Sequence, residues 1–98
     1  MIKYQEAHNI KKLIDKIIFH LGFFHIVPQF VYCFRSTGSK SKRVIARIHG
    51  LSKIWQETLN LQPAYVIEVI SERYDKLSKT EQEKILIHEL LHIPKGFS

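Results

Sequence analysis

What this sequence lacks argues against several classes of protein. Cys33 is its only cysteine, so no internal disulfide can form and no metal site can be built from paired cysteines. The longest nearly apolar run, residues 17–27, is too short to span a bilayer and contains two histidines. Glu6, Asp15 and Lys16 interrupt the N-terminal stretch where a secretion signal would be apolar. We therefore expect a cytoplasmic protein with no membrane partner.

Length and charge narrow the classes further. The 98 residues, 45% of them apolar, are enough for one globular domain with a single core. No internal repeat, linker or low-complexity tract divides the chain, so we expect one domain over residues 1–98. The net charge of +6, from 15 basic and 9 acidic residues, has two interpretations. It favours an anionic partner, or it reflects lysines that keep helix surfaces solvated, and the charge pattern leaves both open.

The N-terminal half predicts one helix followed by two strands. Residues 3–21 carry apolar side chains at helical spacing, with lysines on the other side. Residues 30–34 follow Pro28 as a β-branched and aromatic run, and residues 44–51 form a second predicted strand. The segment between them is polar and basic, with Gly38 as its turn residue. We therefore predict an antiparallel hairpin with a long basic tip.

The middle of the chain adds a short helix and a third strand. Residues 52–59 are predicted to be helical, with Ser52 as the capping residue and Pro63 as the interruption. Residues 64–70 form the third predicted strand, in which Glu68 alternates with apolar neighbours.

A final helix is predicted to open at Lys79. Ser78 and Glu81 have the three-residue spacing of a capping box, and Pro94 ends the helix. The resulting order, α-β-β-α-β-α, predicts an α+β fold. We expect a small, mostly antiparallel sheet of about three strands, flanked by helices.

The final helix contains the letters HELLH, in which His88 and His92 are four residues apart. That spacing places the two imidazoles on one helix face, about 6 Å apart along the axis, where they can bind one tetrahedral ion. Glu89 is rotated by about 100° from His88, so its carboxylate can reach a water molecule on that ion. Zinc lowers the pKa of such a water towards about 7, and the glutamate can accept its proton during attack on a carbonyl carbon. The spacing favours metal-assisted amide hydrolysis with Zn²⁺ as cofactor.

The surroundings of these letters bear on their interpretation. The helix is apolar nearly all round, so we expect it to be buried. Burial makes His88, Glu89 and His92 costly unless they are paired or bound to a metal. The alternative is that they are surface or core side chains that hold no metal.

Three other polar residues are weaker site candidates. His49 lies in the second predicted strand, and no spacing rule links it to the histidine pair. Glu68 is either an exposed residue of its strand, which we favour, or a group that orients a metal-bound histidine. Asp75, before the final helix, has the same two interpretations.

Three stretches of the chain resemble a known family: RSTGSKSKRVIARIHGLSKIWQ (35–56), AYVIEVISERYDKLS (64–78) and ILIHELLHIPKGFS (85–98). Together they are similar to a metallopeptidase family of archaea, archaeal viruses and phages, a small relative of the SprT-like zinc-dependent proteases. The likeness covers roughly residues 34–98. It implies a minimal zincin-like domain and, if the chain is viral, a location in the host cytoplasm.

The resemblance also implies roles for individual residues. His88 and His92 would be zinc ligands, and Glu89 the general base of a peptidase acting on proteins or peptides. In the family a further histidine follows this segment as the third ligand, whereas this sequence stops at Ser98. We therefore expect the domain to lack a C-terminal segment that carries the third ligand. In such proteins a strand bordering the cleft often pairs with the substrate, and residues 64–70 are the candidate by position.

Two other functions stay open. Basic side chains surround a flexible Ser/Gly turn, and such loops contact nucleic-acid phosphates, so a nucleic-acid-associated module is one alternative to a solvated loop. These side chains are Arg35, Lys40, Lys42 and Arg43. A catalytically inactive, peptidase-like interaction protein is the other alternative, and the missing third ligand supports it. The sequence indicates neither the substrate nor the oligomeric state.

Overall fold

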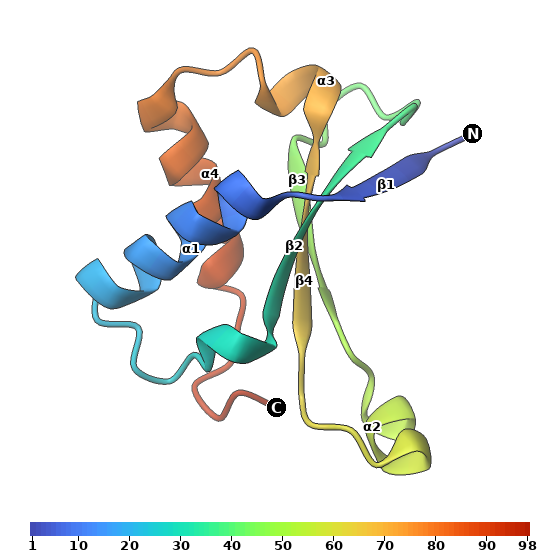
Figure 1. Ribbon diagram of the computed structural model, residues 1–98, viewed down its shortest axis with the longest axis vertical. Coiled ribbons are helices and arrows are strands. Elements are labelled where there is room, and N and C mark those ends of the chain that lie inside the picture. The colour runs from blue at the N-terminus through green and yellow to red at the C-terminus, as the bar shows by residue number, and fades with distance from the viewer.

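A four-stranded mixed sheet with helices packed on one side forms the centre of the protein (Figure 1). The structure is a computed structural model that describes residues 1–98. It confirms the predicted α+β class. In chain order the elements are β1 (Lys3–Glu6), α1 (His8–His20), a 3-10 turn η1 (Pro28–Phe30), β2 (Val31–Thr37), β3 (Ala46–Gly50), α2 (Lys53–Leu59), β4 (Tyr65–Ile70), α3 (Ser71–Tyr74) and α4 (Lys79–Leu90).

The predicted hairpin between β2 and β3 is wrong, because β4 lies between these two strands. The sheet order is β1-β2-β4-β3, with β4 parallel to β2 and antiparallel to β3, and β1 antiparallel to β2. Two of the three pairings are therefore antiparallel. Ile67, Val69 and Ile70 of β4 have no exposed surface, which fits a central strand whose two edges are both paired.

The first helix begins later than predicted. Residues 3–6 form β1, an exposed strand that pairs with β2, and α1 starts only at His8. Ala7 lies at the junction, almost fully buried, and its N–H donates to the carbonyl of Cys33 at 3.0 Å. No glycine or proline separates strand from helix here, so the local pattern contains no break. Pairing with a strand almost 30 residues away decides the conformation.

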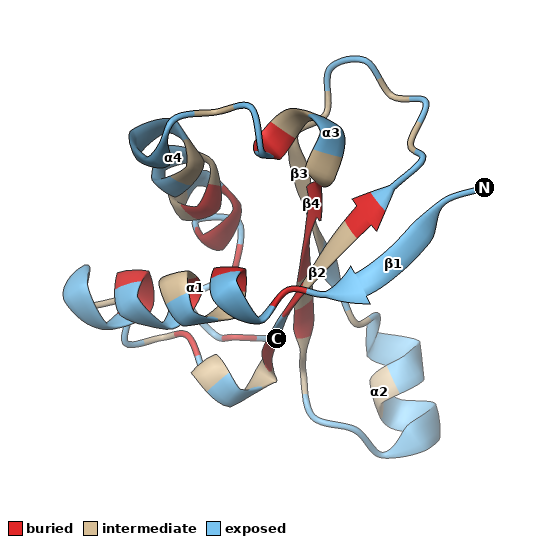
Figure 2. Cartoon of the chain, turned by 45° about the horizontal axis from the view of Figure 1, so that its top comes forward, coloured by how far each residue is buried: buried red, intermediate tan, exposed pale blue.

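One face of the sheet is covered by α1 and α4, and the core lies between them (Figure 2). The predicted alternation of β4 is confirmed, because Tyr65, Ile67 and Val69 all point into this core. Their partners in β3 are Gly50, Ile48 and Ala46, which share that face. The core residues from the two helices include Ile10, Ile14, Ile17, Leu86 and Leu90.

The segment between β3 and β4 contains α2, as predicted. Asn60 ends this helix in the left-handed conformation, at φ 54°, three residues before the proline that we expected to end it. Ser52 occupies the capping position but makes no side-chain hydrogen bond there. None of the four helices combines the length and the apolar character needed to cross a bilayer.

The predicted start of α4 is confirmed in detail. Ser78 Oγ accepts from the Glu81 N–H at 3.2 Å, and the Glu81 carboxylate accepts from the Ser78 N–H at 3.2 Å, which completes a capping box. The expectation that this helix is buried nearly all round is wrong. Only Leu86, Glu89 and Leu90 are buried along it, since one side packs on the core and the other faces solvent.

Candidate metal centre

The C-terminal end of α4 places two imidazole rings side by side. His88 is in the last turn of α4. His92 lies in the turn that follows the helix, and its backbone N–H donates to the Glu89 carbonyl at 3.1 Å. The two ring centres are 5.0 Å apart and the ring planes are 88° apart. Two imidazoles on one tetrahedral zinc ion, with Zn–N bonds of about 2.0–2.1 Å, have ring centres about 5 Å apart. The separation matches that of two ligands on one ion, and it is also that of an edge-to-face contact between the rings.

Both histidines are exposed, contrary to the expected burial of the whole motif. Of the three residues, only Glu89 is buried, at 9% exposed, so only Glu89 loses favourable hydration of its charged form. Burial raises the pKa of the Glu89 carboxyl above its ordinary value, and the neighbouring His88 and His92 offset only part of that rise. A raised pKa makes the Glu89 carboxylate a stronger proton acceptor than an ordinary glutamate.

The donor set supplies two protein ligands. No group of three or more His, Cys, Asp or Glu side chains in residues 1–98 is placed to hold a metal ion. Catalytic zinc sites usually have three protein ligands and one open position. The histidine pair thus offers two possible ligands, one fewer than such a site usually has.

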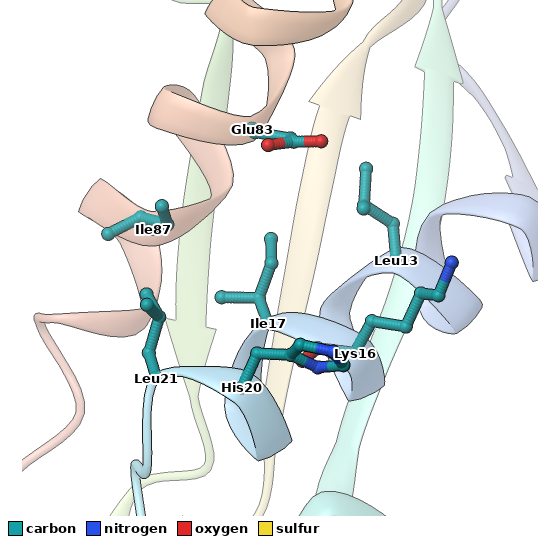
Figure 3. A pocket seen from close by; sticks show the side chains of 7 residues that line it. All are labelled: Leu13, Lys16, Ile17, His20, Leu21, Glu83 and Ile87. Atoms are coloured by element: carbon teal, nitrogen blue, oxygen red, sulfur yellow. The ribbon is translucent and has the colours of Figure 1, made fainter.

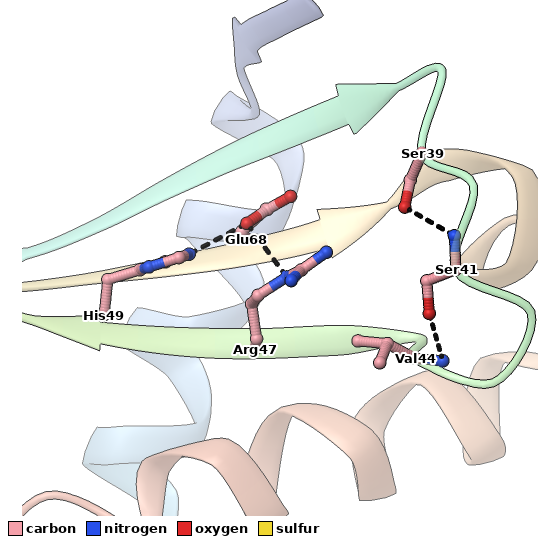
Figure 4. Close-up of polar contacts among 6 residues, drawn as sticks. All are labelled: Ser39, Ser41, Val44, Arg47, His49 and Glu68. Atoms are coloured by element: carbon pink, nitrogen blue, oxygen red, sulfur yellow. Dashed lines mark hydrogen bonds and ion pairs between the residues drawn. The ribbon is translucent and has the colours of Figure 1, made fainter. Parts of the chain in front are cut away.

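Glu68 and His49 belong to a different cluster (Figure 4). Glu68 alternates with core residues of β4, so its side chain lies on the sheet face that α1 and α4 leave uncovered. It is only 4% exposed, with its Oε1 2.8 Å from His49 Nε2 and 3.2 Å from Arg47 Nε. Both interpretations considered for Glu68 are therefore wrong: it is neither exposed nor a partner of the histidine pair.

The pKa of Glu68 reflects these neighbours. Burial by itself raises it, but the Ser36 hydroxyl, the His49 imidazole and the Arg47 guanidinium together hold it below the ordinary value. Two basic side chains thus keep a buried carboxylate ionised on this face.

Arg35 and Asp75 neutralise each other at 2.8 Å, far from the motif in the chain. Asp75 is exposed, as the first of its two interpretations expected, and its partner is Arg35 and not a histidine of the motif. The pairing also removes Arg35 from the set of free cations predicted around the turn. The remaining members of that set, Lys40 and Lys42 with Arg43, are exposed and form no ion pair.

The segment that carries these three cations connects β2 to β3 around the end of β4. Serine hydroxyls order it: Ser41 N–H donates to Ser39 Oγ and Val44 N–H donates to Ser41 Oγ, both at 3.2 Å (Figure 4). The Gly38 N–H donates to the Glu72 carboxylate at 2.8 Å. The predicted basic tip is thus an ordered crossover, not the turn of a hairpin.

A hollow of about 310 Å³ lies between α1 and α4 (Figure 3), and no sequence pattern predicted it. Its lining comes from Leu13, Lys16, Ile17, His20 and Leu21 around α1, and from Glu83 and Ile87 of α4. Ile87 is about 100° around the helix from His88. The hollow therefore opens on a different side of α4 from the histidine pair.

Fold and site together define a small α+β domain with an exposed histidine pair and a buried glutamate at the end of one helix. Comparison with protein families agrees with that class: the family described as "Putative phage metallopeptidase" matches residues 2–98. The chain belongs to this family. The match also includes the N-terminal strand and helix, which the resemblance of the three stretches left out. No curated protein matches the chain, and no solved structure does.

Proposed function

We propose that the protein is a zinc-dependent peptidase of the HExxH type. The observation that carries this proposal is the 5.0 Å separation of the His88 and His92 rings beside the buried Glu89. The family supports peptide bonds as the substrate and a metal ion as the cofactor. Imidazole ligands and a neighbouring carboxylate base are the groups that such hydrolysis uses.

Each residue has a distinct role in this proposal. His88 and His92 hold the ion, which when bound supplies Lewis acidity at the scissile carbonyl. Glu89 removes a proton from the attacking water and delivers it to the leaving amine, which its raised pKa favours. Zinc sites of this kind usually have a third protein ligand, and no third side chain among residues 1–98 is placed beside the pair.

The substrate binds along the free edge of β3 in this proposal. The strand expected for that role, β4, is unsuitable because β2 and β3 occupy both of its edges. β3 ends the sheet and packs against α4, so its outer edge offers unpaired backbone groups next to the motif helix. An extended peptide can add to such an edge as a further strand.

Substitution of Glu89 by glutamine tests the mechanism. Glu89→Gln should bind zinc as the wild type does but lose cleavage of a reduced, alkylated protein, because the base is gone while both ligands remain. Glu83→Gln is the matched control, since this exposed carboxylate is on the same helix. Cleavage at the wild-type rate by Glu89→Gln would refute the assignment.

The basic crossover favours a second candidate function, binding of nucleic acid. Lys40, Lys42 and Arg43 are exposed and free of acidic partners, which suits contact with phosphates. Neutralising all three should weaken DNA binding and reduce its dependence on salt, because fewer counterions are released. Arg35→Gln is the control, since Arg35 is already paired with Asp75. An unchanged salt dependence would exclude the loop.

A further inference from the structure

The short helix α2 presents an apolar surface to solvent. We define the α2 surface as Ile54, Trp55, Leu59 and Leu61, all of which are exposed; Ile54 is 73% exposed and Trp55 55%. No residue of α2 is buried (Figure 2). Large apolar side chains gathered at one exposed place mark an interaction site more often than single scattered ones do.

The α2 helix is amphipathic, although neither of its sides packs on the core. At 100° per residue, Ile54, Trp55 and Leu59 fall within an arc of about 140°. Lys53 and Glu57 lie on the opposite side. The apolar side chains therefore share one side of the helix, where Thr58 lies among them.

The backbone holds this side of α2 in place. Leu51 N–H donates to the Ala64 carbonyl at 2.9 Å, which extends the β3–β4 ladder to the base of α2. The Gln56 side chain donates to the Leu51 carbonyl at 2.8 Å. A helix of seven residues is only marginally stable in isolation, so these two hydrogen bonds help to hold α2 and its apolar side chains in position.

The α2 surface continues from the proposed substrate edge. α2 follows β3 at the end of the sheet where Gly50 pairs with Tyr65. The Tyr65 ring packs edge-on against Phe97 at 5.3 Å, five residues beyond His92. The chain after the motif and α2 thus lie toward the same end of the sheet, with β4 between them (Figure 1). A strand added to β3 would run directly onto the α2 surface.

Charge and area decide which occupant fits. The helix carries one lysine and one glutamate, so it has no net charge to attract an anionic membrane. The free cations lie before β3 and α2 lies after it, with a five-residue strand of about 17 Å between them. Four side chains are also too few for a stable dimer, which buries about 800 Å² per partner. A flexible polypeptide needs only such a small apolar contact.

We propose that the α2 surface binds apolar side chains of an unfolded polypeptide and thereby holds the substrate along β3. This inference rests on the proposed peptidase function and names its substrate class: protein segments that are unfolded and rich in apolar residues. The contact adds affinity for long substrates, and short peptides that end within the β3 edge do not reach it.

Trp55 is the only tryptophan, so its emission reports on this surface directly. The probe is reduced, carboxymethylated ribonuclease A, which lacks tryptophan, added to metal-free Glu89→Gln so that no cleavage occurs. We expect a blue shift of the Trp55 emission on binding. Adding Ile54→Ser and Leu59→Ser should weaken binding about tenfold or more. Phe24→Ser, which removes a large exposed apolar side chain elsewhere, should leave it unchanged.

Several results would overturn the inference: no emission shift at saturating probe, equal affinity after the α2 substitutions, a shift with anionic vesicles but not with the unfolded protein, or a shift on self-association alone. Far-UV circular dichroism checks that the variants fold. Trp55→Phe is a milder second variant, and because it has no tryptophan emission its binding is measured with a fluorescently labelled probe. The two proposals fail separately. Binding without any cleavage by the wild-type, zinc-loaded protein refutes the peptidase but keeps the surface, whereas cleavage of the long substrate unaffected by the α2 substitutions refutes the surface alone.

Discussion

Glu68 Oε1 lies 2.8 Å from His49 Nε2 on the sheet face that no helix covers. This contact accounts for one of the two buried carboxylates, and the other is Glu89. The two have opposite pKa shifts. Burial acts on both, but Glu68 has basic neighbours that more than compensate for it, whereas at Glu89 burial dominates. A compensated buried carboxylate is a structural element, and an uncompensated one beside metal-binding groups indicates a site of chemistry.

Glu68→Gln should destabilise the fold in a pH-dependent way. The folded-state pKa of Glu68 lies below its ordinary value of 4.5, so its stabilising contribution is full above that value and disappears as the pH falls through the folded-state pKa. At neutral pH we expect the free energy of unfolding to fall by about 1–2 kcal/mol, because the charged contacts of Glu68 are lost. The loss is not larger because His49 and Arg47 are partly exposed to solvent. Urea unfolding at several pH values measures this. The exposed Glu57→Gln is the control, and an equal loss at all pH values would contradict the linkage.

Glu89→Gln should have the opposite effect in the metal-free protein. The pKa of Glu89 is raised in the folded state, so its carboxylate destabilises the fold above that pKa and has no effect below the ordinary value of 4.5. We expect the free energy of unfolding of the variant to rise by about 0.5–1 kcal/mol at neutral pH and to be unchanged near pH 4. Substitutions of functional residues often increase stability in this way. Thermal unfolding with a chelator present tests this. A variant less stable than the wild type at neutral pH would contradict it.

Cys33 should resist thiol reagents until the protein unfolds. The side chain is almost fully buried in β2, and burial raises its pKa to about 12, with Lys11 lowering it only slightly. The thiolate is the reactive form, so both access and ionisation are lacking at pH 8. A disulfide exchange assay should show no reaction in buffer and one thiol in urea. Rapid reaction of the folded protein would mean that β2 opens locally.

Tyr74→Phe should be tolerated or slightly stabilising, by up to about 1 kcal/mol. The Tyr74 hydroxyl is buried without a hydrogen-bond partner, and burial raises its pKa to about 12. An unsatisfied buried hydroxyl costs free energy that phenylalanine avoids at the same ring volume. Tyr4→Phe, at an exposed position, is the matched control in thermal unfolding. A loss of more than 1 kcal/mol would indicate a partner for the hydroxyl.

Local sequence patterns determined the helix that carries the candidate site. A capping box opens α4, as predicted, but the helix ends at Leu90 and not at Pro94. The turn that follows keeps His92 beside His88, so a few adjacent residues suffice to predict the pair. The alternation within β4 was predictable for the same reason. Glu89 itself was placed correctly on the helix, but its burial and the exposure of the two rings depended on which side of α4 meets the core.

Only the tertiary structure decided the order of the strands and the partners of the isolated charges. β1 is a strand because β2 is available to pair with it, and β4 is central because β2 and β3 pair with its two edges. Glu68 meets His49 across a strand pairing, and Arg35 meets Asp75 forty positions along the chain. Helix spacing and caps involve residues within one or two turns of each other, so the sequence by itself determined them. Sheet order and buried ion pairs join residues whose proximity exists only after the whole chain has packed, because no local preference favours one distant partner over another.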